Sequence, residues 1–204
     1  QNQQFYDNLG QANRQFYDGL DSTNKIEAMK LASSKNETGD QRLTRLSNAE
    51  DYNTAAAQAA DFAKTATKLA NNADANAGLL NAVQRKIPGT SENTYAKDIE
   101  VLKSQVFLTQ IAKMKGMGAL TDAEGEQLRN SIASLDLNQD PKIVKQNIQA
   151  IATTMQKASQ IAETKAQMYS SNGRGYSKEV LSAAKKRGVS PYEMQKYANE
   201  LAVQ

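Results

Sequence analysis

An Ala-rich segment from residue 49 to residue 83 most constrains the fold that this chain can adopt. Alanine has the highest helix propensity but a small side chain, so such a segment favours a helix that buries little surface by itself. Large side chains are rare in it, and Phe62 and Leu69 have heptad spacing. We predict a long helix, broken between residues 71 and 78. Two interpretations of its alanine face stay open: packing against another copy of itself, or an ordinary amphipathic helix in a local bundle.

Composition limits how large a core the chain can build. Hydrophobic residues make up 39% of the 204 residues, tryptophan is absent and phenylalanine occurs four times. Because Ala-rich helices need neighbours to be stable in water, we predict an all-α protein of modest stability. The region from residue 1 to residue 88 has too few large side chains for a core of its own. We expect it to be extended, helical and dependent on partners.

Two residue types that carry much protein chemistry are missing. The chain has no cysteine and no histidine, which excludes disulfides and removes the commonest general base and metal ligand. We therefore predict a protein that is not an enzyme and binds no cofactor or metal. The net charge of +3 is too small to indicate nucleic acid by itself. The sequence contains no run of 18 apolar residues, so we predict no transmembrane helix.

The clearest break in the chain is Pro88-Gly89, which polar residues follow. Beyond it, apolar residues at helical spacing predict a three-helix antiparallel bundle over residues 92–169. Asp140 and Pro141 suit the N-cap and the first position of its third helix. The predicted helices cover residues 92–115, 122–135 and 141–169. The third carries a coiled-coil-like seam of Val144, Ile148, Ile151, Met155, Ala158 and Ala162.

The last segment, residues 178–204, follows a flexible linker at residues 170–177. Ser190 and Glu193 have the spacing of a capping box, and Pro191 suits the first helical position. The segment therefore predicts a C-terminal helical hairpin.

The turn between the first two bundle helices is the most distinctive motif. Gly116 and Gly118 supply the conformational freedom that a helix end needs. Thr121 and Glu124 have the spacing of a capping box. The simplest interpretation is a connector between two helices.

The turn and its flanking residues also resemble a known family. The residues that carry the resemblance are Phe107, Leu108, Lys115, Gly116, Gly118, Leu120, Thr121, Asp122, Glu124 and Gly125. This pattern resembles a segment that is common in virion proteins of tailed bacteriophages, which are described as structural, internal or DNA-ejection proteins. The resemblance covers about residues 95–165. It implies a protein of the phage particle that assembles with other virion proteins and with copies of itself. The most concrete role that the resemblance implies is that of an internal virion protein. Such a protein leaves the particle with the genome or prepares a path for the genome, and the host cell envelope is its expected location after ejection.

Two similar hexapeptides near the start, QFYDNL at residues 4–9 and QFYDGL at 15–20, lie eleven residues apart. Eleven residues make three helical turns, so Phe5 and Phe16 would share one face. One interpretation is an arm that docks on another chain or on the 92–169 bundle. The other is a stripe that packs on its own domain. The candidate partner-contact residues are Phe5, Tyr6, Phe16, Tyr17 and Phe62.

Basic residues cluster near the end of the chain, with Tyr176 close to them in sequence. Attraction to phosphates needs little more than such a cluster, so nonspecific association with DNA is the second functional hypothesis. The alternative is a solubilising helix whose C-terminal cations suit the helix dipole. The candidate residues are Arg174, Lys178, Lys185, Lys186 and Arg187.

A peptidoglycan-degrading enzyme is the third hypothesis, because some phage virion proteins carry such a domain. That chemistry needs a carboxylic acid with a raised pKa in a cleft. Glu124, Glu126 and Glu163 are candidates only by elimination, and a capping box explains Glu124 better. The run from Asp136 to Asp140 superficially resembles a calcium loop, but it lacks the turn glycine and the final glutamate. A polar loop that ends in an N-cap explains it better.

Overall fold

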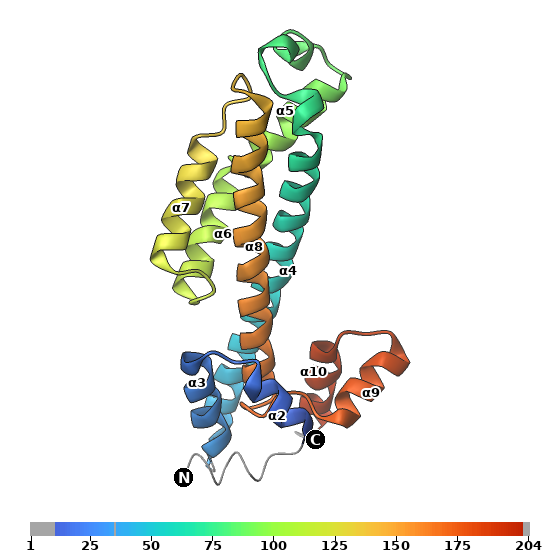
Figure 1. Cartoon of the computed structure of the whole chain (residues 1–204). Coiled ribbons are helices and arrows are strands. Elements are labelled where there is room, and N and C mark those ends of the chain that lie inside the picture. Colours follow the sequence, from blue (N-terminus) through green and yellow to red (C-terminus); the bar gives the residue numbers. More distant parts are fainter. Residues whose placement is uncertain (1–10, 35, 202–204) are drawn as a thin grey trace. The chain divides into compact units, whose positions relative to one another are not determined.

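The computed structural model describes residues 11–34 and 36–201, and helices form nearly all of this part of the chain (Figure 1). No strand occurs among these residues, so the all-α prediction is confirmed. The α-helices are α2 (Gln11–Asp18), α3 (Ser22–Ser33), α4 (Gly39–Asn76), α5 (Ser91–Leu102), α6 (Gln105–Gly116), α7 (Asp122–Ala133), α8 (Pro141–Ser170), α9 (Lys178–Arg187) and α10 (Pro191–Leu201). Two short 3₁₀ helices, η1 (Leu79–Asn81) and η2 (Gln84–Lys86), follow α4.

The chain divides into two compact units. Unit 1 combines Gln1–Thr54 with Ala162–Gln204, and unit 2 is Ala55–Ile161. Both borders lie inside helices, because α4 and α8 each contribute one part to each unit. The division therefore differs from the predicted domains: residues 1–88 do not form a region of their own, and residues 92–169 share their core with the second part of α4.

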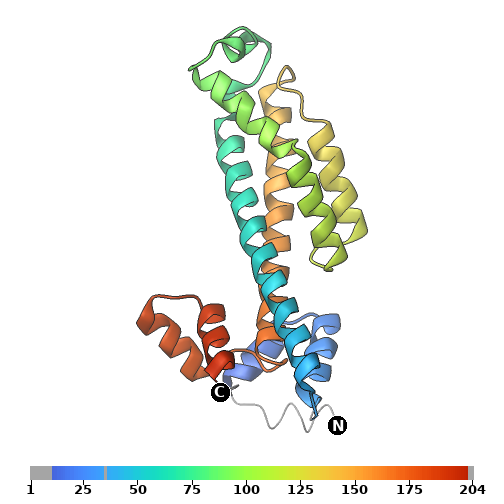
Figure 2. The same cartoon turned by 180° about the vertical axis from the view of Figure 1, so that it is seen from behind.

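In unit 2 the two long helices run antiparallel and side by side, as both views show (Figures 1 and 2). The hydroxyl of Ser159 on α8 donates a hydrogen bond of 2.9 Å to the backbone carbonyl of Ala56 on α4. A serine side chain is short, so this bond requires the two backbones to approach closely, and alanine side chains permit that approach. The buried alanines of α4 follow a 4-3-4-3 spacing, at Ala59, Ala63, Ala66, Ala70 and Ala73. The predicted helix therefore packs against a neighbouring helix of its own chain.

Most of the large side chains of the unit 2 core come from the other helices, and α4 adds Leu69. The predicted seam of α8 is buried in this unit, at Val144, Ile148, Ile151, Met155 and Ala158. From α5, α6 and α7 come Tyr95, Ile99, Leu102, Phe107, Ile111, Met114, Leu128 and Ile132. These residues compensate for the small volume of the α4 alanines.

The predicted helix over residues 92–115 is wrong as a single element. It is two helices, because α5 ends at Leu102 and Ser104 caps a new one. The hydroxyl of Ser104 accepts a hydrogen bond from the backbone N–H of Phe107 at 3.3 Å. The predicted break between residues 71 and 78 lies near the end of that range. The helix α4 continues to Asn76 and stops before Gly78, whose φ is +94°.

In unit 1 the loop after α8 is the element against which the first helices pack. The phenol of Tyr17 on α2 is fully buried and donates a hydrogen bond of 2.6 Å to the backbone carbonyl of Gly173. Tyr17, Ala28 and Met168 form one buried cluster from α2, α3 and α8. Gly173 has a φ of +74°, and a Cβ atom at this position would overlap the carbonyl oxygen of Ala28. The loop can lie this close to α3 only because residue 173 is glycine.

We predict that Gly173→Ala destabilises unit 1 more than Gly188→Ala does. Gly188 also has a positive φ, of +68°, but no atom lies within 4 Å of the position that a Cβ would occupy there. The control should lose about 1–2 kcal/mol of unfolding free energy from the left-handed conformation alone. Gly173→Ala should lose about 1–3 kcal/mol more, because its methyl group also overpacks against α3. Urea unfolding measures both values, and equal losses would contradict the close packing of the loop.

Candidate interaction surfaces

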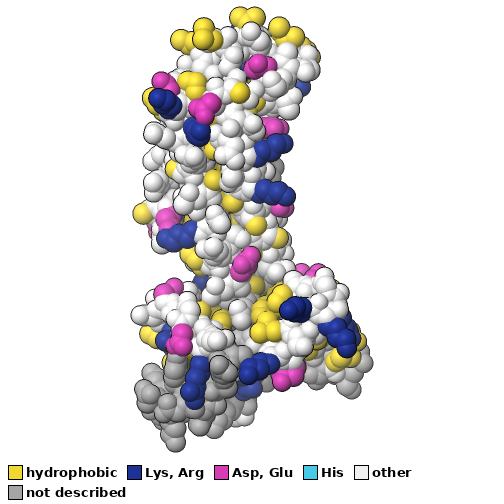
Figure 3. All heavy atoms as spheres, turned by 45° about the vertical axis from the view of Figure 1, so that its right-hand side comes forward, with side chains coloured by type: hydrophobic (Ala, Val, Ile, Leu, Met, Phe, Trp, Pro, Cys, Tyr) yellow, Lys and Arg dark blue, Asp and Glu magenta, His cyan; other side chains and the backbone are white. Residues whose placement is uncertain are grey.

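The segment between α4 and α5 exposes large apolar side chains to solvent. The exposed fractions are 74% for Leu79, 93% for Leu80, 69% for Val83 and 49% for Ile87. These four residues are called the apolar tip below. Hydrophobic side chains gather at this end of unit 2 in the space-filling view (Figure 3). Several exposed large apolar side chains within one short segment suit an interaction surface.

Polar side chains of the same segment donate hydrogen bonds to several of its own backbone carbonyls. Their acceptors are the carbonyl oxygens at the end of α4 and in η2. Asn81 donates to Ala75 and Ala77, Arg85 to Asn76 and Gly78, Thr90 to Gln84 and Ile87, and Asn93 to Arg85, all at 2.6–3.2 Å. Because the loop carbonyls have partners inside the protein, burial of the apolar tip in a partner would leave few of them unsatisfied.

Two contacts fix this segment to the loop that precedes α8. The guanidinium of Arg85 donates to the side-chain oxygen of Asn138 at 2.7 Å. The backbone N–H of Gly78 donates to the carbonyl of Leu137 at 2.8 Å. The apolar tip is thus held in one conformation, which lowers the entropy cost of binding a partner through it.

A second apolar surface is a groove in unit 1 between the start of α4 and α10. It has a volume of about 430 Å³. Its wall on α4 includes Leu43, Leu46 and Ala49, and Leu43 is 69% exposed. The remaining lining residues are Glu50, Ser170, Tyr192, Lys196, Asn199 and Glu200. This surface is called the α4–α10 groove below.

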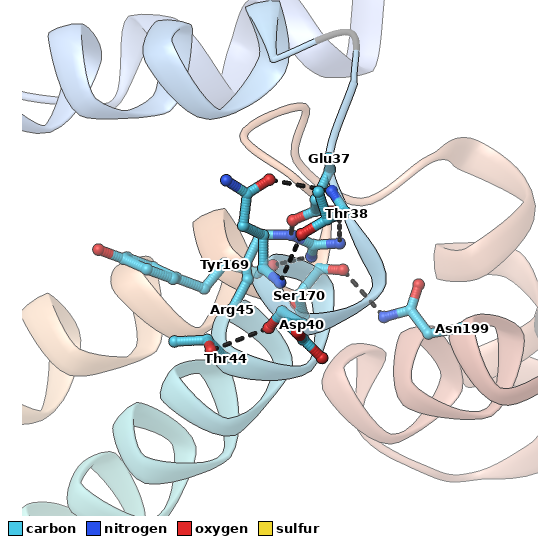
Figure 4. A network of polar contacts seen from close by, with 9 residues as sticks. Glu37, Thr38, Asp40, Thr44, Arg45, Tyr169, Ser170 and Asn199 are labelled. Carbon is cyan, nitrogen blue, oxygen red and sulfur yellow. Dashed lines mark hydrogen bonds and ion pairs between the residues drawn. The ribbon is translucent and has the colours of Figure 1, made fainter.

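A polar network holds the helices that form the groove (Figure 4). Arg45 is buried and pairs with both carboxylate oxygens of Glu37, at 2.6 and 3.0 Å. It also donates to the carbonyl of Tyr169 at the end of α8. Asn199 on α10 donates to the next carbonyl, that of Ser170, at 3.0 Å. Side chains from α4 and α10 thus satisfy carbonyls that the last turn of α8 leaves without helical partners.

The polar end of the groove carries an ionised carboxylate. One oxygen of Glu50 accepts hydrogen bonds from the Tyr192 hydroxyl at 2.8 Å and from the Lys196 ammonium at 3.0 Å. The bonds from Lys196 and then from Tyr192 hold the pKa of Glu50 below its usual value, against the smaller opposing effect of desolvation. Burial, followed by the bond to Glu50, raises the pKa of the Tyr192 phenol. Near neutral pH, Glu50 is therefore an anion.

The structure brings together three of the five basic residues that sequence reasoning singled out. Lys178 and Lys185 are two helical turns apart on α9 and share a face, and Lys186 is adjacent. All three are exposed. The Arg187 guanidinium instead lies 5.5 Å from the centroid of the Tyr197 ring on α10. Arg174 is exposed in the loop before α9.

The aromatic candidates that the structure describes pack within the chain. Tyr17 is fully buried and packs on its own domain, the second of the two interpretations of the aromatic stripe. The Phe16 ring lies edge-on to it at 5.6 Å and packs against Gly175, where a Cβ would clash with that ring. Phe62 contacts Phe107 of the predicted bundle, with ring centroids 4.4 Å apart. Phe5 and Tyr6 lie outside the described residues.

The acidic candidates serve helix ends and ion pairs. Glu124 accepts hydrogen bonds from Thr121 and from the Lys157 ammonium, which lies 2.5 Å away. These bonds, led by that from Lys157, lower the pKa of Glu124 to about 2, whereas a glycosidase acid needs a raised pKa. Glu126 pairs with Arg129 at 3.3 Å, and Glu163 is exposed on α8.

The Asp136–Asp140 loop is organised by its own backbone. The carboxylates of Asp136 and Asp140 accept hydrogen bonds from the N–H groups of Asn138 and Lys142. Within the described residues, no group of three His, Cys, Asp or Glu side chains is arranged to hold a metal ion. No described helix is long and apolar enough to cross a membrane.

No protein-family model matches this chain, and no match to it was found among curated proteins or solved structures. Function is therefore inferred from the sequence motif, the apolar tip, the α4–α10 groove and the basic face of α9.

We predict that Glu124→Gln reduces the acid sensitivity of unit 2. The pKa of Glu124 is lowered from 4.5 to about 2, so the charged carboxylate stabilises the fold above pH 4.5. This contribution is lost as the pH falls through about 2. Glutamine can still complete the capping box, but it lacks the charge. Between pH 6 and pH 2 the variant should lose less unfolding free energy than the wild type, as measured by urea unfolding. Parallel pH profiles would disprove the assignment.

Proposed function

We propose that this chain is a structural or internal protein of a tailed-phage particle that acts by assembling with other proteins. The apolar tip carries the proposal, because it presents four exposed apolar side chains on a segment several of whose carbonyls already accept hydrogen bonds. The resemblance of the turn at residues 113–128 to phage virion proteins supports the choice of a virion as the assembly. The partners are other virion proteins and copies of this chain.

The energetic reason for an interface at the apolar tip is straightforward. Each leucine that leaves water on binding contributes about 1.5–3 kcal/mol when it is fully buried. Leu79 and Leu80 are adjacent and are 74% and 93% exposed, so a partner that covers them removes a large apolar surface from water. The rigid attachment of the segment to the loop before α8 lowers the ordering cost.

A role in genome delivery is the more specific form of the proposal. A protein that leaves a capsid through a narrow portal benefits from a chain that unfolds easily. The alanine face of α4 buries little surface per residue, and the chain contains no cysteine that could form a disulfide. The protein would then move from the particle to the host cell envelope with the genome.

Nonspecific association with DNA is the second candidate, and the basic face of α9 favours it. Three exposed lysines on one helix can contact phosphates without reading bases. We expect retention on DNA to fall with salt and to weaken when Lys178, Lys185 and Lys186 are changed to glutamine. A triple glutamine variant at Lys64, Lys68 and Lys97, which are exposed elsewhere, is the matched control. Equal salt dependence of both variants would remove this candidate.

We predict that a Leu79→Ser/Leu80→Ser variant enters particles poorly. The measurement is mass spectrometry of virions purified after the variant replaces the wild-type gene, with the chain quantified against the capsid protein. The control is Ile26→Ser/Leu181→Ser, which changes two exposed apolar residues outside both surfaces. Normal incorporation of the tip variant would contradict a role for the apolar tip, and absence of the wild-type chain from virions would contradict the virion role.

The same virions test delivery. After genome release is triggered in vitro, an ejected protein is depleted from the emptied particles. Retention at full copy number would leave a fixed structural role.

A further inference from the structure

We propose that the apolar tip of one copy docks into the α4–α10 groove of a second copy. This inference rests on the proposed assembly role and names the partner of the tip. Shape, apolar lining and charge each support it.

The two surfaces have complementary forms. The tip is a projecting turn with two adjacent exposed leucines, and the groove is a concave site of about 430 Å³. This volume is within the range of about 300–1,000 Å³ that is usual for pockets that bind compact ligands. The side chains of Leu79 and Leu80 are of a size to enter such a site together.

The two surfaces also match in polarity. Leu43 on the groove wall is largely exposed, as are the leucines of the tip, so contact between them removes apolar surface from water on both sides. The carbonyls of the tip segment are satisfied by Asn81, Arg85 and Thr90. The groove is formed by helices, whose backbones are internally hydrogen-bonded. Few polar groups therefore lose a partner when the surfaces meet.

The exposed charge beside the tip is positive, whereas the groove lining carries two carboxylates, Glu50 and Glu200, and one ammonium, Lys196, which is paired with Glu50. Residues 77–91 contain Arg85 and Lys86 and no acidic residue. Arg85 is directed into the protein, whereas Lys86 is exposed. The groove offers the exposed carboxylate of Glu200 at its edge. A Lys86–Glu200 pair at the rim would contribute to orientation more than to affinity.

A contact of this kind joins different surfaces of two identical chains. One such contact leaves one tip and one groove of the pair free. These two either meet each other in a closed, reciprocal dimer or bind further copies and extend the assembly into a ring or an open chain. A tip-to-tip contact would use no groove.

The experiment uses the full chain and two variants in sedimentation equilibrium over a wide concentration range. The tip variant is Leu79→Ser/Leu80→Ser, and the groove variant is Leu43→Lys, which replaces an exposed leucine and repels Lys86. The wild type should form dimers or larger species as concentration rises, and each variant alone should stay monomeric. An equimolar mixture of the two variants should form a 1:1 complex and no larger species, because only one intact tip and one intact groove remain. Formation of this complex also shows that both variants are folded.

A charge exchange tests the rim pair separately. Lys86→Glu and Glu200→Lys should each weaken association of the otherwise wild-type chain at least several-fold. The double variant should recover most of the lost association. Each of its contacts joins the new carboxylate at position 86 to the new ammonium at position 200 of the next copy. Failure of the double variant to recover would overturn the proposed orientation.

Other occupants of the tip give different results. If the groove variant still forms dimers, the contact is tip to tip. If the wild type stays monomeric but binds vesicles of anionic lipid through its tip, the occupant is a membrane surface. Either result overturns the inference. The wild type could also stay monomeric while the tip variant fails to enter virions. This pair of results would overturn the tip–groove contact alone and leave the proposed function standing.

Discussion

The contact between the alanine face of α4 and α8 is the interaction on which the rest of the structure depends. Ser159 reaches the carbonyl of Ala56 because no larger side chain separates the two helices. A seam of alanines buries too little apolar surface to hold a fold by itself. Most of the large side chains therefore come from α8 and from the shorter helices α5, α6 and α7. Since α4 and α8 each run through both units, the same two helices also supply the frame on which α2, α3, α9 and α10 of unit 1 assemble.

Local sequence signals predicted the helical elements well where a cap or a seam marks them. Each of these elements is determined by residues that are close in sequence. Examples are the α8 seam from Val144 to Ala158, the capping box of Thr121 and the helix starts at Pro141 and Pro191. The division into units could not be read in this way. It depends on contacts between residues more than a hundred positions apart, such as Arg45 with the carbonyl of Tyr169. No periodicity encodes such a pairing.

The candidate surfaces show the same division between local and long-range signals. The second copy of the aromatic repeat, with Phe16 and Tyr17, packs on the loop with Gly173 and Gly175, whose composition alone indicated a flexible linker. The apolar tip could have been found as Leu79-Leu80 directly after Gly78, yet only the structure shows that Asn81 and Arg85 donate hydrogen bonds to nearby carbonyls while the leucines face solvent. These polar side chains thus have partners within the chain, whereas the leucine side chains remain exposed. This contrast is the main reason to regard the exposed leucines as an interface.

Burial of the apolar tip on assembly is the central claim, and the absence of cysteine from the chain allows a direct measurement. A Leu80→Cys variant carries a single thiol on the tip, and an Ala123→Cys variant carries one at an exposed position of α7. Both thiols should react rapidly with a maleimide in the isolated protein. In assembled particles we expect the thiol at position 80 to be strongly protected relative to the thiol at position 123. Equal reactivity of the position-80 thiol in the free and assembled states would contradict burial of the tip.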